Sequence, residues 1–497
     1  MPSPSRCGNK QMKMHTFKHI LPAAALLCAG VAWAQPPRGG TVSLDSCRRM
    51  ALRYNKQLRM TDRSIESAGY LHDVAKAAYL PKLDLGLTYA YNTGTVNLLK
   101  ADAYLPTFSF DPATGSYKPN VVVGADGKPV VNPKTGEPVF SEVAMIPKSA
   151  MSFNTHQVMG GAITLTQPVY MGGEIRAMDA ITGYARKLAE QSRDLASQDV
   201  VYAVDQAYWT VVSLEHKKTL AVSYLSLMDT LQYDVNRMLD AGVGTRSDTL
   251  RVRVSVNEAQ LTLTKVENGL SLARMALAQI CGLPVHTYLE PADRGLADQP
   301  PAAPGMGYDM SDVYASRPDL GMLRTGVRIF EEKENVARAG MLPKIAIVGA
   351  YTLSNPNLNN GFHRSFGGGF TIGATLAMPL WNWGSGYNRL RAARAETAAQ
   401  RLALEDACEK VELQVSQARF RYQEAYKTYA MTESNMRSAD ENLRQATLSF
   451  REGVGTINDV LAAHTAWLQA HSEKIDAEIG IQLCNVYLSK VLGTLKY

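Results

Sequence analysis

The chain is an internal duplication, and this feature constrains its fold more than any other. Three pairs of segments match in order: 78–83 with 340–345 (AYLPKL and GMLPKI), 167–170 with 378–381 (QPVY and MPLW), and 242–245 with 453–456 (GVGT in both). The first pair has an offset of 262 residues and the other two have an offset of 211. Two halves therefore align along the chain, and the first half carries 51 additional residues between Pro81 and Pro168.

In each half, the sequence predicts a helical stretch followed by two strands. The helical stretches are 44–79 and 311–340, and a proline follows each of them. In 82–91, five large apolar residues alternate with small or polar ones, which is typical of a strand with one apolar face. The other predicted strands are 162–169, 344–351 and 369–379. The longer strands have the length of about ten residues that a strand needs to cross a membrane.

A long helix and a shorter returning helix follow the strands in each half. The segments 174–239 and 385–451 contain no proline. Apolar residues recur in them every seven positions, which indicates coiled-coil-like packing. Each long helix is expected to end at a GVGT turn, because glycine adopts the positive φ that terminates helices. The returning helices are predicted over 248–280 and 459–492.

Composition and the N-terminus indicate an exported protein. Of the net charge of +6, residues 1–34 contribute +4, so the remainder is too nearly neutral for a nucleic-acid binder driven by bulk charge. A basic segment, a short apolar run and the A-x-A site Ala32-Trp33-Ala34 predict a signal peptide within 1–34. Six cysteines in 497 residues exclude a disulfide scaffold. Catalytic and metal-binding motifs are missing, so we expect no enzymatic activity, no metal and no cofactor.

Four strands are too few to close a membrane barrel, for which eight is the usual minimum. Open sheet edges are not tolerated in lipid. A chain that places four strands in a membrane must therefore share its barrel with other copies, and three copies supply twelve strands.

The duplicated order of strand, long helix, turn and helix, with the turns 242–248 (GVGTRSD) and 453–459 (GVGTIND), resembles the TolC family of outer-membrane efflux channels. The resemblance implies a mixed, predominantly α fold: a homotrimer with a 12-stranded transmembrane β-barrel, four strands per chain, continued by a periplasmic α-helical coiled-coil barrel. It also implies a periplasmic adaptor (membrane fusion) protein and an inner-membrane pump of RND, ABC or MFS type as partners. Small-molecule efflux is the favoured function. The alternatives are the channel of a type I protein secretion system or, outside the channel class, a periplasmic coiled-coil adaptor.

In that family the tunnel narrows at the periplasmic helix tips. The expected pore-constriction or gating residues of this chain are Asp248, Asp459, Arg246, Ser247 and Asn458. Both aspartates also fit a helix-capping box with the threonine three residues earlier, and this capping role is compatible with gating. Arg246 either pairs with a neighbouring acid or is simply solvated. The expected turn and adaptor-docking residues are Gly242, Gly244, Thr245, Gly453, Gly455 and Thr456.

Five aromatic residues cluster where strands join helices: Tyr79, Tyr170, Trp381, Trp383 and Tyr387. Tyrosine and tryptophan favour membrane interfaces, so we expect contact with outer-membrane lipid, with ordinary packing as the alternative. The predicted organisation is a first repeat over 35–281, with an extracellular loop at 92–160, a proline-rich equatorial crossover at 282–310, and a second repeat over 311–497.

Overall fold

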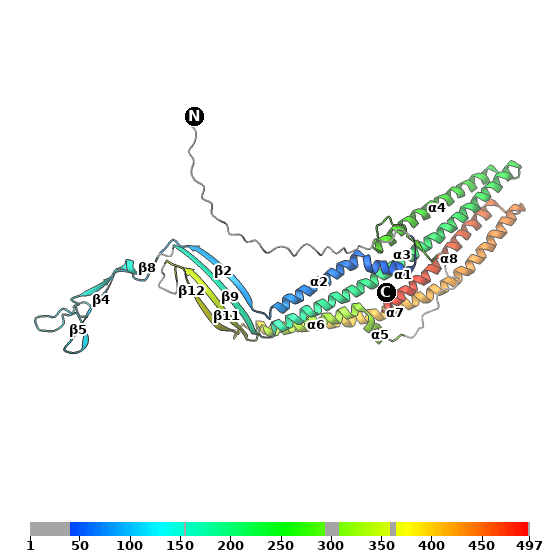
Figure 1. Ribbon diagram of the computed structural model, residues 1–497. Helices are drawn as coiled ribbons and strands as arrows, with labels where there is room; N and C mark the ends of the chain where they lie inside the picture. The colour runs from blue at the N-terminus through cyan, green and yellow to red at the C-terminus, as the bar shows by residue number, and fades with distance from the viewer. Residues whose placement is uncertain (1–39, 154–155, 294–307, 358–363, 496–497) are drawn as a thin grey trace, which may run out of the picture.

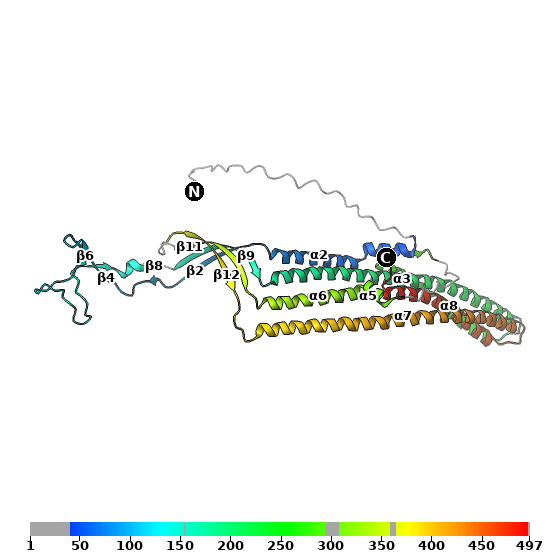
Figure 2. The same ribbon diagram turned by 90° about the horizontal axis from the view of Figure 1, so that it is seen from below.

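The computed structural model describes residues 40–153, 156–293, 308–357 and 364–495, in which a sheet at one end continues into long helices (Figures 1 and 2). The predicted signal segment 1–34 lies outside these residues, as do 294–307 of the predicted crossover. The described part of the crossover contains strand β10 (Glu290–Pro291), which pairs in parallel with β1 (Thr41–Val42). The sequence did not predict this short pairing.

The main sheet has four antiparallel strands in the order β12-β11-β9-β2. They are β2 (Lys82–Tyr91), β9 (Gln157–Met171), β11 (Lys344–Asn355) and β12 (Gly367–Ala377). The prediction of a strand over 82–91 is confirmed. The predicted start of β9 at residue 162 was wrong, because Gly160 and Gly161 continue the ladder opposite Thr88 and Leu87.

The two long helices have equal lengths, as do the two returning helices. α3 (Glu174–Asp240) and α7 (Ser385–Arg451) have 67 residues each, and α4 (Arg246–Ile280) and α8 (Ile457–Val491) have 35 each. At 1.5 Å per residue, a long helix extends about 100 Å. In the part of the chain that is described, no helix is both long enough and apolar enough to cross a membrane.

The leading helical stretches are each broken in two, where the sequence predicted one continuous stretch. They form α1 (Leu44–Tyr54) and α2 (Lys56–Ala77) in the first half, and α5 (Met310–Ser316) and α6 (Pro318–Ala339) in the second. The side chain of Asn55 caps α2 by accepting the Gln57 N–H at 2.8 Å, and it donates to the Ile280 carbonyl at 2.8 Å. The end of α4 therefore abuts the break, and α4 and α2 follow one another along α3 (Figure 1).

The segment between β2 and β9, predicted as a loop over 92–160, contains paired strands. Three two-stranded ladders project beyond the main sheet (Figure 1). They pair β3 (Val96–Asn97) with β8 (Ser152–Phe153), β4 (Ala103–Pro106) with β7 (Val143–Ile146), and β5 (Phe108–Asp111) with β6 (Ser116–Pro119). A 3-10 helix, Lys148–Met151, precedes β8. Short, proline-interrupted strands lack the length that makes alternation recognisable in a sequence.

Candidate functional site

The four-stranded sheet has one apolar face and one face of small and polar residues. Directly paired residues point to the same side of a sheet. The register places Leu85, Ile163, Tyr351 and Phe370 in one row, and the side chains of this row are 46–70% exposed. The neighbouring row, on the opposite face, contains Asp84, Thr164, Ala350 and Thr371. An exposed apolar face of this extent indicates a surface that contacts a membrane or another protein and not water.

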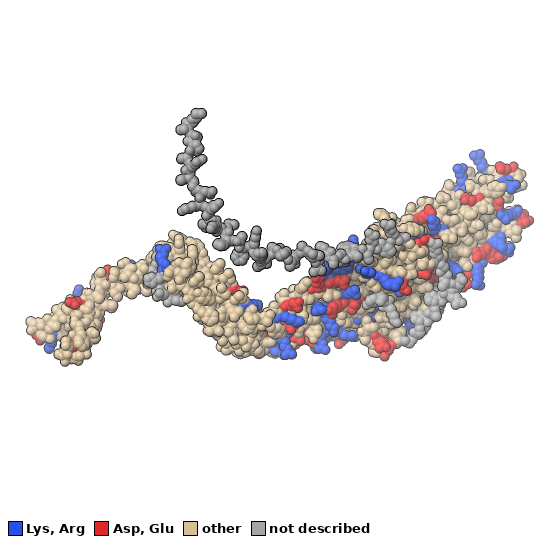
Figure 3. Space-filling view, in the orientation of Figure 1, with Lys and Arg blue, Asp and Glu red and all other residues tan. Residues whose placement is uncertain are grey.

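Charged side chains are concentrated on the helices rather than on the sheet. On the face of the molecule in Figure 3, the sheet is mostly free of charged residues, and dense positive and negative charge begins where the helices begin. One ion pair at this boundary joins Lys344 of β11 to Glu174 of α3. The boundary between the apolar and charged parts therefore coincides with the junction of strands and helices.

The predicted interface aromatics all lie at this junction. Tyr79 follows α2, Tyr170 is the next-to-last residue of β9, and Tyr387 is in the first turn of α7. Trp381 and Trp383 lie between β12 and α7, with their rings edge to face at a centroid distance of 5.8 Å. All five side chains are exposed in the single chain, by 43–87%. The structure thus brings them to one end of the sheet, at the boundary of apolar and charged surface.

The outer strands of the sheet each have one unpaired edge. Within the described residues, β2 pairs only with β9, and β12 pairs only with β11. Unpaired edges of strands this long are templates for pairing with another chain.

At the opposite end of the molecule, glycines close the turn between α3 and α4 for two different reasons. Gly242 has a φ of 77°, in the left-handed region where a side chain is strained. Gly244 lies close to α3, because a Cβ at this position would be 2.9 Å from the backbone nitrogen of Leu239. The N–H groups of Val243 and Gly244 both donate to the Met238 carbonyl at 3.0 Å, which satisfies the end of the helix. Gly453 and Gly455 build the same turn after α7.

Thr245 and Thr456 begin the returning helices as capping residues. The N–H of Asp248 donates to the Thr245 hydroxyl at 3.2 Å, and the N–H of Asp459 donates to the Thr456 hydroxyl at 3.3 Å. Each hydroxyl donates in turn to the carboxylate of its aspartate, at 2.5 and 2.6 Å. The Asp459 carboxylate also accepts the backbone N–H of Thr456 at 3.0 Å, which completes a capping box. Both aspartates therefore serve helix starts in the single chain.

These hydrogen bonds have an electrostatic consequence at Asp459. Donation from the Thr456 hydroxyl, and then from its backbone N–H, holds the pKa of the Asp459 carboxyl below its usual value. The Asp459 side chain is exposed and that of Asp248 is half-buried. The second turn therefore presents an exposed, ionised carboxylate at neutral pH.

Contacts between the two turns were not predicted from the sequence. Arg251 of α4 donates to the Asn458 side chain of α8 at 2.9 Å, and Arg451 of α7 pairs with Asp234 of α3 at 3.1 Å. A buried apolar cluster joins the helices at this tip; it contains Tyr224, Met228, Leu231, Val235, Val252, Ala259, Ile457 and Val460. Arg246 and Ser247 are exposed, and Arg246 forms no ion pair with any described residue. Arg246 is thus solvated in the single chain.

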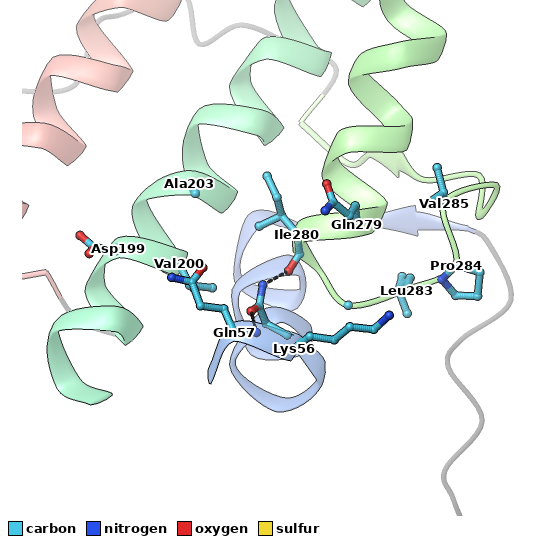
Figure 4. Close-up of a pocket in the computed structure, with 12 residues that line it drawn as sticks. Lys56, Gln57, Asp199, Val200, Ala203, Gln279, Ile280, Leu283, Pro284 and Val285 are labelled. Carbon is cyan, nitrogen blue, oxygen red and sulfur yellow. Dashed lines mark hydrogen bonds between the residues drawn. The ribbon is translucent and has the colours of Figure 1, made fainter. Parts of the chain in front are cut away.

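The end of α4 meets the break between α1 and α2 at a place that we call the equatorial joint. A cavity of about 720 Å³ lies there (Figure 4). Lys56, Asp199, Val200, Ile280 and Leu283 contribute to its lining, so charged and aliphatic groups are mixed in it. Across the described ranges, no group of three or more His, Cys, Asp or Glu side chains is arranged to hold a metal ion.

Comparison with known proteins gives matches to outer-membrane transport proteins. A sequence model described as "Outer membrane efflux protein" matches residues 139–283 and 310–494. The alkaline protease secretion protein AprF of Pseudomonas aeruginosa is 25% identical over 302 residues, which are 59% of this chain and 61% of AprF. The outer membrane efflux protein BepC of Brucella suis biovar 1 is 23% identical over 351 residues, which are 70% of this chain and 74% of BepC. The chain thus matches about three fifths of AprF and three quarters of BepC.

The fold is also that of a solved outer-membrane protein. The crystal structure of VceC from Vibrio cholerae aligns with a TM-score of 0.65 at 15% identity, over 90% of this chain and 96% of VceC. At this low identity the likeness shows a shared fold. It extends over the sheet and the helical part together.

Proposed function

Because the chain belongs to the outer membrane efflux protein family, we propose that it forms the exit duct of a tripartite export system. The chain is an outer-membrane protein with a large periplasmic helical part. In our proposal, small molecules such as drugs and toxic compounds pass from an inner-membrane pump and a periplasmic adaptor through this duct to the outside. The duct is gated at the helix tips.

The single observation that carries this proposal is a sheet with one apolar face and two open edges. Lipid accepts the apolar face, but it does not accept the unpaired backbone groups of β2 and β12. Pairing β2 of one copy with β12 of the next removes both edges, and three copies then close a barrel of twelve strands. The small and polar face lines its interior. The halves 35–281 and 311–497 each contribute two strands per chain.

The orientation of the duct follows from the same sheet. The interface aromatics and the charged boundary lie at the helical end, so this end meets the periplasmic surface of the outer membrane. The projecting ladders β3 to β8 then lie outside the cell, and the described part of the predicted crossover, 282–293, lies near the middle of the periplasmic part. Tyr79, Tyr170, Trp381, Trp383 and Tyr387 contact lipid headgroups in this arrangement.

The tip residues receive their proposed roles from the trimer. Three copies bring six carboxylates, from Asp248 and Asp459, toward one axis, and such a ring favours cations in a pore. Arg246, Ser247 and Asn458 lie beside this ring. The turn residues Gly242, Gly244, Thr245, Gly453, Gly455 and Thr456 form the surface that the periplasmic adaptor meets. Val243 and Val454 are 73% and 83% exposed there, which suits an apolar docking contact.

Small molecules are the favoured cargo, and secreted protein is the alternative. The name of BepC refers to efflux, whereas that of AprF refers to secretion of an alkaline protease. The pump, of RND, ABC or MFS type, selects the cargo in this scheme. A strain lacking this chain should become more susceptible to several toxic small compounds while its set of secreted proteins stays the same. Loss of one secreted protein with unchanged susceptibility would favour the alternative.

The assembly is tested by native mass spectrometry of the protein extracted from outer membranes in mild detergent. We expect a mass of three chains that survives dilution. A folded sample that runs as a monomer would leave both sheet edges open and would overturn the barrel.

A further inference from the structure

Two cysteine thiols meet in the core at the equatorial joint. Cys47 lies on α1, and Cys281 is the C-terminal capping residue that directly follows α4. Both side chains are completely buried, at 0% exposure. The Cys281 thiol donates to the Cys47 carbonyl oxygen, with Sγ and O 3.7 Å apart. The two residues are 234 positions apart in the sequence, so only the fold brings them together.

The joint around the thiols is fixed by independent contacts. Asn55 Nδ2 donates to the Ile280 carbonyl at 2.8 Å. Gly282 has a φ of 75°, and a Cβ there would lie 2.4 Å from the carbonyl carbon of Tyr54, so the two backbones are in close contact. Both cysteines belong to one buried apolar cluster with Tyr208. The contact between α1 and the end of α4 is therefore part of the buried core.

The other two described cysteines form a matched control within the same chain. Cys408 is on α7 and Cys484 is on α8, and both are partly exposed. The Cys484 Sγ contacts the carbonyl of Arg421, which is 13 residues beyond Cys408 along α7. At 1.5 Å per residue this separation is about 20 Å, too far for a bond between the two sulfurs.

We propose that Cys47 and Cys281 are joined by a disulfide bond in the exported protein. This inference rests on the location of the chain in the outer membrane and not on its proposed channel function. A protein bound for that membrane passes through the periplasm, which is an oxidising compartment where disulfides form and persist.

The oxidation balances with a thiol–disulfide oxidant, a periplasmic protein that carries a reactive disulfide. The thiolate of one cysteine, formed by loss of its proton, attacks a sulfur of that disulfide and forms a mixed disulfide. The thiolate of the second cysteine then attacks the first cysteine's sulfur and releases the oxidant. The chain loses two protons and two electrons, and the oxidant leaves as a dithiol.

Burial sets the order of events. Contact with Cys47, followed by burial, raises the pKa of the Cys281 thiol in the folded chain, which disfavours the reactive thiolate. The folded joint also excludes an oxidant of protein size, since both side chains have no exposed surface. Oxidation therefore precedes the final docking of α1. Afterwards the same burial protects the bond from reductants.

The disulfide closes a covalent ring that contains β2, β9, α3 and α4. The second half has no such ring, because the repeat positions that correspond to the two cysteines are Asp309 and Leu492. The bond thus fastens the first half at its joint, whereas noncovalent contacts hold the second, including a bond from the Arg317 guanidinium to the Val491 carbonyl at 3.1 Å.

The test is an alkylation experiment on the full-length protein after export. Cells are lysed in N-ethylmaleimide, and the outer-membrane protein is denatured without reductant, labelled again and weighed by intact mass spectrometry. Cys7 and Cys28 lie in the predicted signal segment, so four cysteines remain after its removal. We expect labels on only two of these four, Cys408 and Cys484, and a linked peptide pair that contains Cys47 and Cys281. Reduction before labelling should yield labels on all four.

Labels on all four cysteines without reductant would overturn the proposal and leave the pair as packed thiols. A link from either buried cysteine to Cys408 or Cys484 would overturn it as well. As a second measurement, Cys47→Ala should make Cys281 available for labelling after denaturation; a Cys281 that stays blocked would contradict the pairing. Trimer mass and conductance are measured separately, so failure of the disulfide leaves the channel proposal standing, and the reverse also holds.

Discussion

The turn after α3 and the turn after α7 have the same four residues and follow helices of equal length, but they are anchored differently. At the first position of the returning helix, the first half has Arg246, which is exposed and solvated. The second half has Ile457, which is 4% exposed and belongs to the tip cluster. α8 also packs on both α7 and α3, whereas α4 packs mainly on α3. The comparison shows that the local sequence determines the conformation of the turn. One side chain, at the first position of the returning helix, determines how strongly the turn is packed against the tip cluster.

The largest expected effect comes from removing that anchor. Ile457→Ala should reduce the local stability of the second tip by about 2–4 kcal/mol, because it leaves a cavity in the cluster. Hydrogen exchange of the amides around Thr456 measures this loss. Arg246→Ala, the matched change in the first half, should alter exchange by less than about 0.5 kcal/mol, since the side chain is solvated. Equal changes in hydrogen exchange for the two variants would contradict the claim that the two turns are anchored differently.

The caps should show a smaller difference. Thr245→Ala and Thr456→Ala each remove a hydroxyl that bonds one N–H and one carboxylate, at a cost of about 1 kcal/mol. The effect should be greater at Thr456, where the hydroxyl also helps to orient the Asp459 carboxylate for its bond to the backbone N–H. Hydrogen exchange at the starts of α4 and α8 checks the order. A larger loss at Thr245 would contradict it.

Acid should weaken the second cap. The pKa of Asp459 is lowered in the folded chain, so its stabilising contribution is present above the ordinary pKa of an aspartate, near 4. It is lost as the pH falls through the lowered value. Exchange at the start of α8, corrected for the intrinsic pH dependence, should therefore rise below about pH 4. Thr456→Ala should flatten this rise, and a pH response that is unchanged in that variant would exclude the Thr456 bonds as its cause.

The smallest effect is expected where the two halves differ most in length. Deleting residues 100–147 removes β4 to β7 but keeps β3 paired with β8, and this pairing holds the new ends close together. Trimer mass in detergent should not change. Loss of the trimer would show that the projecting ladders are part of the assembly and not a surface extension.

Several elements could be predicted from the sequence because their signals are local. The bounds of α3 and α7 agree within one residue with the proline-free segments, since a glycine lies directly before each helix and another lies two residues after its end. β2 matches because its alternation is uninterrupted. The breaks at Asn55 and Arg317 were missed, since capping by Asn55 is visible only together with its second bond to Ile280.

The contacts of the tip could not be predicted in the same way. The bond between Arg251 and Asn458 and the burial of Ile457 depend on how α8 packs against α3 and α4, which no local pattern encodes. The meeting of Cys47 and Cys281 is likewise a product of the tertiary fold. The sequence could place residues at the tip, but not state which of them hold it together.

The central claim is a trimeric pore narrowed by the carboxylates of both turns, and single-channel recording in a planar bilayer tests it most directly. Wild-type protein should give a small, cation-preferring conductance that multivalent cations block. Asp248→Asn with Asp459→Asn removes the charges but keeps an oxygen for each cap, and it should raise the conductance and abolish the block. Thr245→Ala with Thr456→Ala, which keeps both charges, should preserve the cation preference. Wild-type conductance and block in the asparagine variant would contradict the account and leave capping as the role of both aspartates.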